Sequence, residues 1–279
     1  MTEPLSPEAR AEMMALIRDA DSVELKLTVS ETDRYATLEA LEVDPLDAHI
    51  RQVFFLDTPD LDLDAAGLVV RARRIQRELA DTTVKLRPVV PAELPADLRA
   101  DPAFGVEVDA MPGGFVCSGS MKGGSTNGKI LKTVRKGGPY AKLFTEGQRA
   151  LFADHAPAGI GVDDLTVLGP IAVFKLKLKV SDLGRKLTLE MWNYPDGSRI
   201  LELSTKAAPA EAIEVADAAR AFLDGRGVDL TAEQTTKTRT ALEYFAGRSR
   251  GYTRSPFYPL LAASRWRTRD TALRTSSIV

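Results

Sequence analysis

Residues 174–180 read Phe174-Lys-Leu-Lys-Leu-Lys-Val180, in which lysines alternate strictly with apolar residues. Successive side chains of a β-strand point to opposite faces, so Lys175, Lys177 and Lys179 share one face. Like charges two residues apart on one face repel each other, and solvated surfaces usually mix both signs. The stretch therefore predicts a strand with a lysine-rich face, which taken alone is most simply the solvated side of a half-buried sheet.

Six further stretches alternate in the same way, at residues 22–29, 68–75, 82–88, 104–110, 186–192 and 200–206. The turn Asn193-Tyr-Pro-Asp-Gly-Ser198 favours a hairpin between the last two of them. The seven charged faces hold ten basic side chains, Lys26, Arg71, Arg73, Lys85, Arg87, Lys175, Lys177, Lys179, Lys186 and Lys206. The same faces hold five acidic side chains, Glu24, Glu107, Asp109, Glu190 and Glu202.

Two interpretations of these faces stand side by side. The plain one is a half-buried antiparallel sheet whose charged side faces water. The excess of basic groups favours the other, in which a polyanion relieves their repulsion and the carboxylates hold a divalent cation.

Four segments are expected to be helical and to cover the apolar strand faces. Ser6-Pro7 opens a helix over residues 8–19. Capping-box patterns at Thr145 and Thr231 open helices to about His155 and Phe245. Residues 208–226 form a long Ala-rich amphipathic stretch. We therefore expect an antiparallel barrel with a charged lumen and helices packed outside.

Chain length and charge distribution define the expected domains. The chain has 279 residues, with 37 Lys+Arg against 39 Asp+Glu. We expect one domain over residues 1–246, in which the Gly-rich basic zone 113–143 is a loop or insertion. Residues 247–279 form a basic, aromatic tail in which seven arginines stand against one aspartate, a net charge of +6. Such a tail suits nucleic acid or an anionic surface, or else is a solvated terminus or docks on a partner subunit.

Composition excludes several classes of protein. One cysteine, Cys117, allows no internal disulfide, which favours a reducing, cytoplasmic setting. The sequence has no apolar run long enough to predict a membrane span. Its acidic N-terminus is a poor secretory signal. With only His49, His155 and Cys117, a zinc site of several Cys and His ligands is excluded, and any metal must be held by carboxylates.

Three stretches together resemble a known family. They are Val23-Glu-Leu-Lys-Leu-Thr-Val29, the segment from Phe54 to Arg74 that contains Asp57-Thr-Pro-Asp-Leu, and Thr83-Val-Lys-Leu-Arg87. They look like the CYTH domain of the triphosphate tunnel metalloenzymes, which include class IV adenylate cyclases and thiamine triphosphatases. The resemblance covers roughly residues 20–245 and is weakest at 113–143.

The resemblance implies an α+β fold, an eight-stranded antiparallel β-barrel forming a tunnel. It implies substrate-binding cations, carried here by Lys26, Arg71, Arg73, Lys85, Arg87, Lys177 and Lys206. It implies carboxylates that hold Mg²⁺ or Mn²⁺, carried here by Glu24, Glu107, Asp109, Glu190 and Glu202. Among the cations, Lys26, Lys177 and Lys206 are the candidate catalytic groups. Lys237 is a further candidate, but its position near a helix start favours the surface.

Two positions depart from the family pattern. The entrance motif Glu-x-Glu-x-Lys has Ser22 in place of its first carboxylate, and the late Glu-x-Glu motif has Ser204 in place of its second. Asp21 is not a substitute for the missing carboxylate, because the strand period puts it on the opposite face. A weaker metal site, one metal instead of two, and binding without hydrolysis all stay open.

The leading hypothesis is a metal-dependent hydrolase of a small triphosphate, inorganic or organic. The alternatives are a class IV-type nucleotidyl cyclase and a binding module for a triphosphate or nucleotide. Nucleic acid is not expected as a partner except through the tail, and a homodimer stays open.

Overall fold

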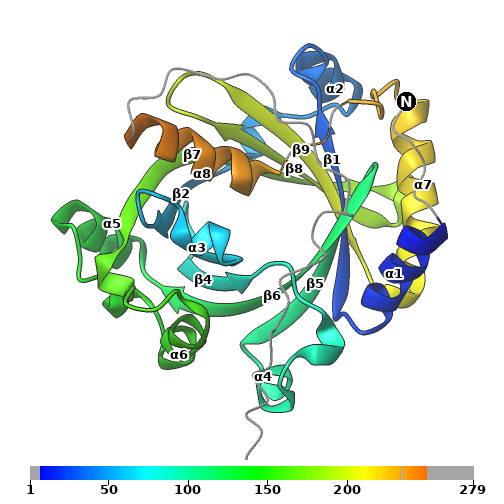
Figure 1. Ribbon diagram of the computed structural model, residues 1–279. Helices are drawn as coiled ribbons and strands as arrows, with labels where there is room; N and C mark the ends of the chain where they lie inside the picture. The colour runs from blue at the N-terminus through cyan, green and yellow to red at the C-terminus, as the bar shows by residue number, and fades with distance from the viewer. Residues whose placement is uncertain (1–6, 233, 235, 250–279) are drawn as a thin grey trace, which may run out of the picture.

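The computed structural model describes residues 7–232, 234 and 236–249, and its strands close into one barrel (Figure 1). The strands are β1 Ser22–Val29, β2 His49–Asp57, β3 Leu68–Ile75, β4 Ala80–Leu86, β5 Phe104–Met111, β6 Gly114–Ser125, β7 Thr166–Val180, β8 Arg185–Asn193 and β9 Arg199–Ala207. Their order is β1-β5-β6-β4-β3-β2-β7-β8-β9, and β9 pairs back onto β1. The predicted barrel is confirmed.

Strand number and direction differ from the expectation. The described chain has nine barrel strands instead of eight, because β2 and β6 join the seven that alternation predicts. The barrel is also mixed, since β1 and β5 pair in parallel while the other neighbours are antiparallel. Closure leaves no free sheet edge for another chain to pair with.

Most helices cover the outside of this barrel, as expected. The helices are α1 Pro7–Arg18, α2 Arg34–Ala40, α3 Asp62–Ala65, α4 Ala96–Ala100, α5 Asn127–Lys136, α6 Glu146–His155, α7 Ala212–Gly225 and α8 Lys237–Ser249. The capping box at Thr145 opens α6. Gln148 then fixes α6 to the barrel, since its amide nitrogen donates to the carbonyls of Thr82 and Met121 at 3.0 and 3.1 Å.

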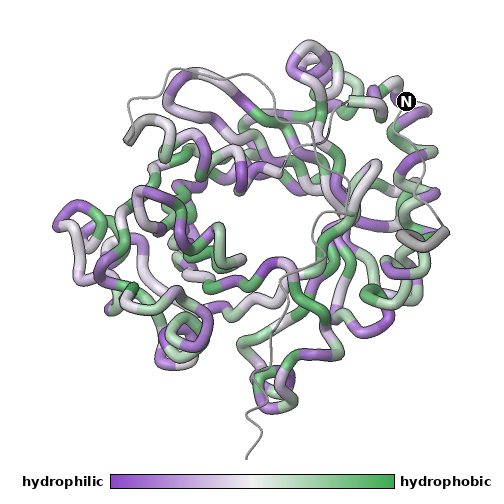
Figure 2. The backbone as a smooth tube through the Cα atoms, viewed as in Figure 1, coloured by the Kyte–Doolittle hydropathy of each residue, from purple (hydrophilic) through white to green (hydrophobic). Residues whose placement is uncertain are grey.

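The largest core cluster lies between the barrel and its outer helices. It joins the apolar faces of β3, β4, β5 and β6 to Ile17 of α1, Ile130 of α5, Leu151 of α6 and Val215 of α7. Hydrophilic and hydrophobic residues alternate along many strands in Figure 2, as a charged lumen inside an apolar outer layer requires. No helix in the described ranges combines the length and the apolar character that crossing a bilayer demands.

The expectation of a loop over residues 113–143 is wrong. This zone supplies β6 and α5, and β6 pairs with both β4 and β5. Its glycines make room for neighbouring side chains. A Cβ at Gly119 would lie 2.4 Å from the Phe104 ring, and one at Gly123 would lie 2.5 Å from the Gln148 side-chain oxygen.

The stretch after Asp57 is a turn and a short helix, as expected. Asp57 is buried and accepts hydrogen bonds from the backbone nitrogens of Thr58, Leu63 and Asp64 at 2.7, 2.9 and 3.0 Å. The bonds from Leu63 and Asp64 satisfy free N–H groups in the first turn of α3.

Helix α8 begins later than the sequence predicts and packs against the inner wall at one end of the barrel. The capping box expected at Thr231 does not open it. Instead, Gln234 bonds to the backbone of Thr28 through both its amide atoms, at 2.8 and 3.2 Å, and α8 starts at Lys237. Leu242 then packs against inward-facing apolar residues of β2, β7 and β8, such as Phe55 and Trp192. The predicted tail lies outside the described residues from residue 250 onward.

Candidate functional site

Three carboxylates meet where β1 and β5 run side by side. The parallel register sets Ser22 beside Glu107 and Glu24 beside Asp109. One oxygen from each of Glu24, Glu107 and Asp109 lies within 4.8 Å of the others, and these three residues are called the carboxylate triad below. Convergent carboxylate oxygens are the ligands that Mg²⁺ and Mn²⁺ prefer, so this donor set fits a divalent metal.

Basic side chains surround the triad. Lys26 Nζ lies 2.8 Å from Asp109 and 3.1 Å from Glu24, and Arg87 lies 3.3 Å from Asp109. Lys206 pairs with Glu107. Burial alone raises the pKa of Asp109, but Lys26, Lys85 and Arg87 outweigh it and hold that pKa well below its usual range. Asp109 is therefore ionised at neutral pH.

Ser22 and Ser204, the two positions where the sequence departs from the pattern it resembles, both touch the triad. Ser22 Oγ donates to Glu107 Oε2 at 3.2 Å, and Ser204 Oγ donates to Glu24 Oε1 at 3.0 Å. Asp21 lies on the opposite side of the strand, as expected, and binds Arg99 at 3.0 Å.

The other two predicted metal ligands form a separate cluster. Glu190 and Glu202 are neighbours on β8 and β9, and Lys237 Nζ lies 2.5 Å from the first and 2.6 Å from the second. Lys175 Nζ lies 2.8 Å from Glu190. The expectation of a surface position for Lys237 is thus wrong, because α8 carries this side chain into the barrel.

A third cluster consists of arginines from β2 and β3. Arg73 pairs with Asp81 at 2.5 Å, and Arg71 donates to the hydroxyl of Thr83 at 3.3 Å. Arg51 and Arg71 each have a buried Nε with no hydrogen-bond partner among the described residues. Burial, together with the charge of Arg73, lowers the pKa of Arg71 to about 10. Desolvated, mutually repelling guanidinium groups attract an anion.

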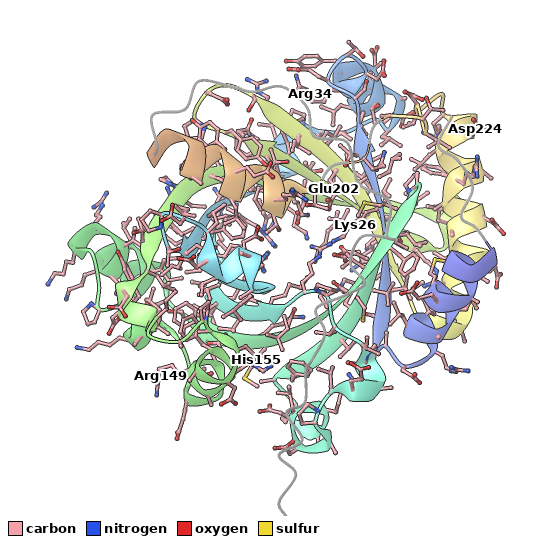
Figure 3. All side chains as sticks on the ribbon, viewed as in Figure 1. Lys26, Arg34, Arg149, His155, Glu202 and Asp224 are labelled. Atoms are coloured by element: carbon pink, nitrogen blue, oxygen red, sulfur yellow. The ribbon has the colours of Figure 1, made fainter. Side chains whose placement is uncertain are left out.

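Lys85 is a further buried cation on β4. Burial lowers its pKa to about 8, although Asp109 acts in the opposite direction. Figure 3 places Lys26 and Glu202 within the ring of strands, whereas Arg149 and Asp224 lie at its periphery. Lys26, Lys85 and Glu202 thus lie in the lumen, as strand alternation predicts.

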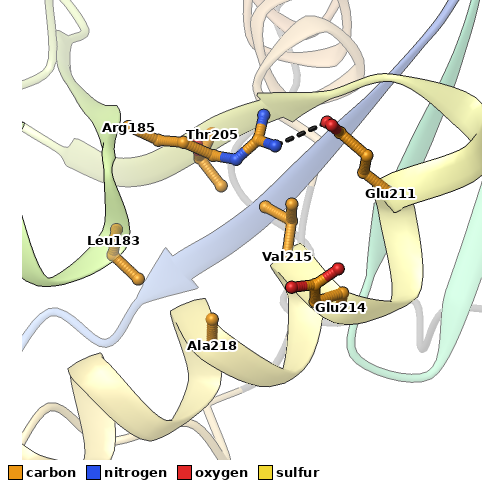
Figure 4. Close-up of a pocket in the computed structure, with 7 residues that line it drawn as sticks. All are labelled: Leu183, Arg185, Thr205, Glu211, Glu214, Val215 and Ala218. Carbon is orange, nitrogen blue, oxygen red and sulfur yellow. Dashed lines mark hydrogen bonds and ion pairs between the residues drawn. The ribbon is translucent and has the colours of Figure 1, made fainter.

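The end of the barrel away from α8 opens into a cavity of about 700 Å³. Its basic lining residues are Lys175, Lys177, Lys179, Arg185, Lys186 and Lys206. Lys177, Lys179 and Lys186 are exposed, so they lie at the mouth and not beside the triad. A smaller cavity of about 200 Å³ lies outside the barrel against α7, where an ion pair joins Arg185 and Glu211 (Figure 4).

The predicted site residues are thus distributed over several groups. Lys26, Arg87 and Lys206 join the triad, Glu190 and Glu202 bind Lys237, and Lys177 stands at the mouth. Arg51 was missed, because β2 does not alternate.

The comparisons agree with this geometry. No protein-family model and no curated protein sequence matches the chain. Among solved structures, HpAC1 from Hippeastrum matches with a TM-score of 0.58 and 15% identity, covering 78% of this chain and 93% of that one. It is described as a candidate adenylyl cyclase with a dominant triphosphatase activity.

A second solved structure has the same architecture. A protein of Bacillus halodurans described as a candidate adenylate cyclase matches with a TM-score of 0.54 and 13% identity, covering 79% of this chain and 97% of that one. Identities this low establish the fold alone. In its fold, this chain is a tunnel barrel of the CYTH type.

Proposed function

We propose that the barrel binds a small triphosphate, inorganic or organic, with Mg²⁺ or Mn²⁺ and hydrolyses it. The observation that carries the proposal is a set of largely buried cations, Arg51, Arg71 and Lys85, that form no ion pair with any described carboxylate and lie in the same lumen as the carboxylate triad. Burying an unpaired charge is costly, and a polyanion offsets that cost. The fold shared with HpAC1 supports the same reaction class.

Each group has a role in this proposal. Arg71, Arg73, Lys85 and Arg87 bind phosphate oxygens, with arginines suited to bidentate contacts. Lys26 and Lys206, next to the triad, neutralise charge that develops on the transferred phosphoryl group, and Lys177 receives the leaving phosphate at the mouth. The triad would hold the metal, which supplies charge neutralisation and orientation when it is bound.

Phosphate release tests this proposal. The purified protein is incubated with tripolyphosphate, ATP or thiamine triphosphate, each with Mg²⁺ or Mn²⁺. We expect release of phosphate from at least one of them, and a loss of about 100-fold or more in Glu24→Gln. The matched control is Glu214→Gln, whose side chain is exposed on α7. Neither phosphate nor a cyclic product from any substrate would contradict catalysis.

Cyclisation of a nucleotide is the alternative reaction. Both neighbouring structures are described as candidate adenylate cyclases. A cyclase needs a pocket for the base, and the residues lining the mouth include no aromatic ring. Cyclic AMP formed from ATP without phosphate release would favour this alternative.

Binding without turnover is a second candidate, which the two serines favour. Ser22 and Ser204 lower the negative charge beside the triad, and each triad carboxylate already has a cationic neighbour. Tight tripolyphosphate binding by calorimetry, little dependence on divalent metal and no hydrolysis would favour a binding module.

A further inference from the structure

Lys237 is held between two carboxylates in the interior of the barrel. Its Nζ lies 2.5 Å from Glu190 and 2.6 Å from Glu202, and it stands 5.4 Å from the ring centroid of Trp192. The indole nitrogen of Trp192 donates to Glu190 at 3.3 Å. Burial alone lowers the pKa of Lys237, but the two carboxylates outweigh it and raise that pKa, so the ammonium stays charged.

The backbone around Lys237 is fixed as well. The hydroxyl of Tyr194 donates to the carbonyl of Lys237 at 3.1 Å, and Gln234 binds the backbone of Thr28 just before α8 begins. Leu242, further along α8, packs against the inner wall of the barrel. These contacts fix the backbone from which the Lys237 side chain reaches the two carboxylates.

The triad differs from the Glu190–Glu202 pair in two ways: it has three carboxylates instead of two, and one of its cationic neighbours is exposed to solvent. Among the described residues, Glu24, Glu107 and Asp109 are the one group of three carboxylates close enough to share an ion, and the pair Glu190–Glu202 has no third member. The Lys206 side chain on the triad is 57% exposed, whereas that of Lys237 is 16% exposed. Lys206 can move into solvent when an ion arrives.

The balance of charge around Glu190 and Glu202 also disfavours a metal ion there. Lys175 and Lys237 together balance Glu190 and Glu202, so a divalent ion would gain little from this pair. It would also have to displace a buried ammonium, which would then lack a partner, and that is strongly unfavourable.

We infer that Lys237 is a built-in cation that occupies the Glu190–Glu202 pair and limits the barrel to one divalent metal ion, at the triad. The inference rests on the metal binding proposed above. It revises the sequence prediction that all five carboxylates are metal ligands.

Counting bound Mn²⁺ tests the inference without any substrate. Calorimetric and electron paramagnetic resonance titrations of the wild-type protein are expected to give one ion, which Glu24→Gln removes and Glu202→Gln retains. Lys237→Met is expected to bind a second ion at Glu190 and Glu202. Lys237→Arg keeps a cation there and is expected to bind one. The matched control is Arg239→Met on the exposed face of α8, also expected to bind one.

The outcomes separate the two proposals. Two ions in the wild-type protein, or a single ion lost in Glu202→Gln and kept in Glu24→Gln, would overturn the inference and leave the proposed function standing. One ion in a folded Lys237→Met protein would show that Lys237 excludes nothing. No ion in the wild-type protein would overturn the inference and the metal requirement of the proposed function together. If Lys237→Met does not fold, the wild-type count and the two carboxylate variants decide.

Discussion

Ser22 donates a hydrogen bond of 3.2 Å from its hydroxyl to Oε2 of Glu107, across the parallel pairing of β1 and β5. The family pattern has a carboxylate at this position, directly beside the triad. The serine keeps the contact with Glu107 but contributes no negative charge. The same substitution by serine occurs at position 204, where the hydroxyl bonds to Glu24. Strands β1 and β9 thus each place a neutral hydroxyl beside the triad.

Restoring the first carboxylate is expected to strengthen metal binding. Ser22→Glu adds a fourth acidic group at the triad, and the number of charged ligands sets the affinity of an oxygen-ligand site. We expect the Kd for Mn²⁺, measured by calorimetry, to fall about tenfold, which corresponds to roughly 1.4 kcal/mol. Ser22→Gln is the control of equal size without charge. Equal Mn²⁺ affinity in Ser22→Glu and Ser22→Gln would show that the lost carboxylate does not matter.

Arg51 is expected to bind the triphosphate although no sequence pattern identified it. Its Nε is buried without a hydrogen-bond partner among the described residues, and burial and then Arg73 lower its pKa. Hydrogen bonds to charged groups contribute about 1.5–3 kcal/mol, so Arg51→Ala should raise the Kd for tripolyphosphate roughly 10- to 100-fold. The control is Arg220→Ala, on the exposed surface of α7. Equal affinity in the two variants would place Arg51 outside the binding site.

Lys85 is expected to make tripolyphosphate binding depend on pH. Burial lowers its pKa to about 8, so the free protein loses this positive charge as the pH rises through that value. Affinity for tripolyphosphate should then fall by up to about tenfold per pH unit above the pKa. Lys85→Arg keeps its charge and should abolish this step. A wild-type affinity profile between pH 7 and 9 that matches that of Lys85→Arg would contradict the assignment.

Lys85 is also expected to lower the free energy of unfolding of the ligand-free protein. Because its folded pKa lies below its unfolded value, the unfolded chain binds more protons between the two, and stability rises with pH across that window. At neutral pH the buried charge is unfavourable. Lys85→Met should therefore raise the melting temperature of the free protein while it weakens tripolyphosphate binding. A lower melting temperature would show that Lys85 is needed to balance Asp109.

Strand alternation predicts seven strands and their inner faces. It fails for β2, where the side chains inside the barrel are apolar instead of charged. In β2, Val53 and Phe55 face inward with Arg51, because α8 fills that end of the barrel with apolar side chains. The strand is therefore apolar on both faces near its end and has no alternating pattern. β6 fails for another reason, since glycines stand where Phe104 and Gln148 need room.

Lys237 was misjudged because sequence spacing reports only on its own helix. Its threonine-rich neighbourhood resembles an exposed helix start. Its real surroundings, Glu190 and Glu202, come from strands β8 and β9, which are 35 or more positions earlier in the chain. A contact between the end of the chain and the barrel wall depends on the closure of the whole sheet, which no local pattern contains.

Gly67 links the turn after α3 to the position of Arg87, and its substitution should affect both stability and binding. Its φ is +76°, and a Cβ there would lie 2.8 Å from the carbonyl oxygen of Arg87. The backbone nitrogen of Arg87 also donates to the carbonyl of Gly67 at 2.8 Å. Gly67→Ala should cost about 2 kcal/mol through backbone strain, which lowers the melting temperature by roughly 4–8 °C.

Because Arg87 pairs with Asp109, the displaced strand end should also weaken tripolyphosphate binding. Gly128→Ala is the matched control, since Gly128 lies in α5 with nothing within 4 Å of the added Cβ, and alanine there should be neutral or slightly stabilising. Calorimetry and thermal unfolding of both variants measure the two effects. A Gly67→Ala protein with the melting temperature and affinity of Gly128→Ala would show that this turn does not position Arg87.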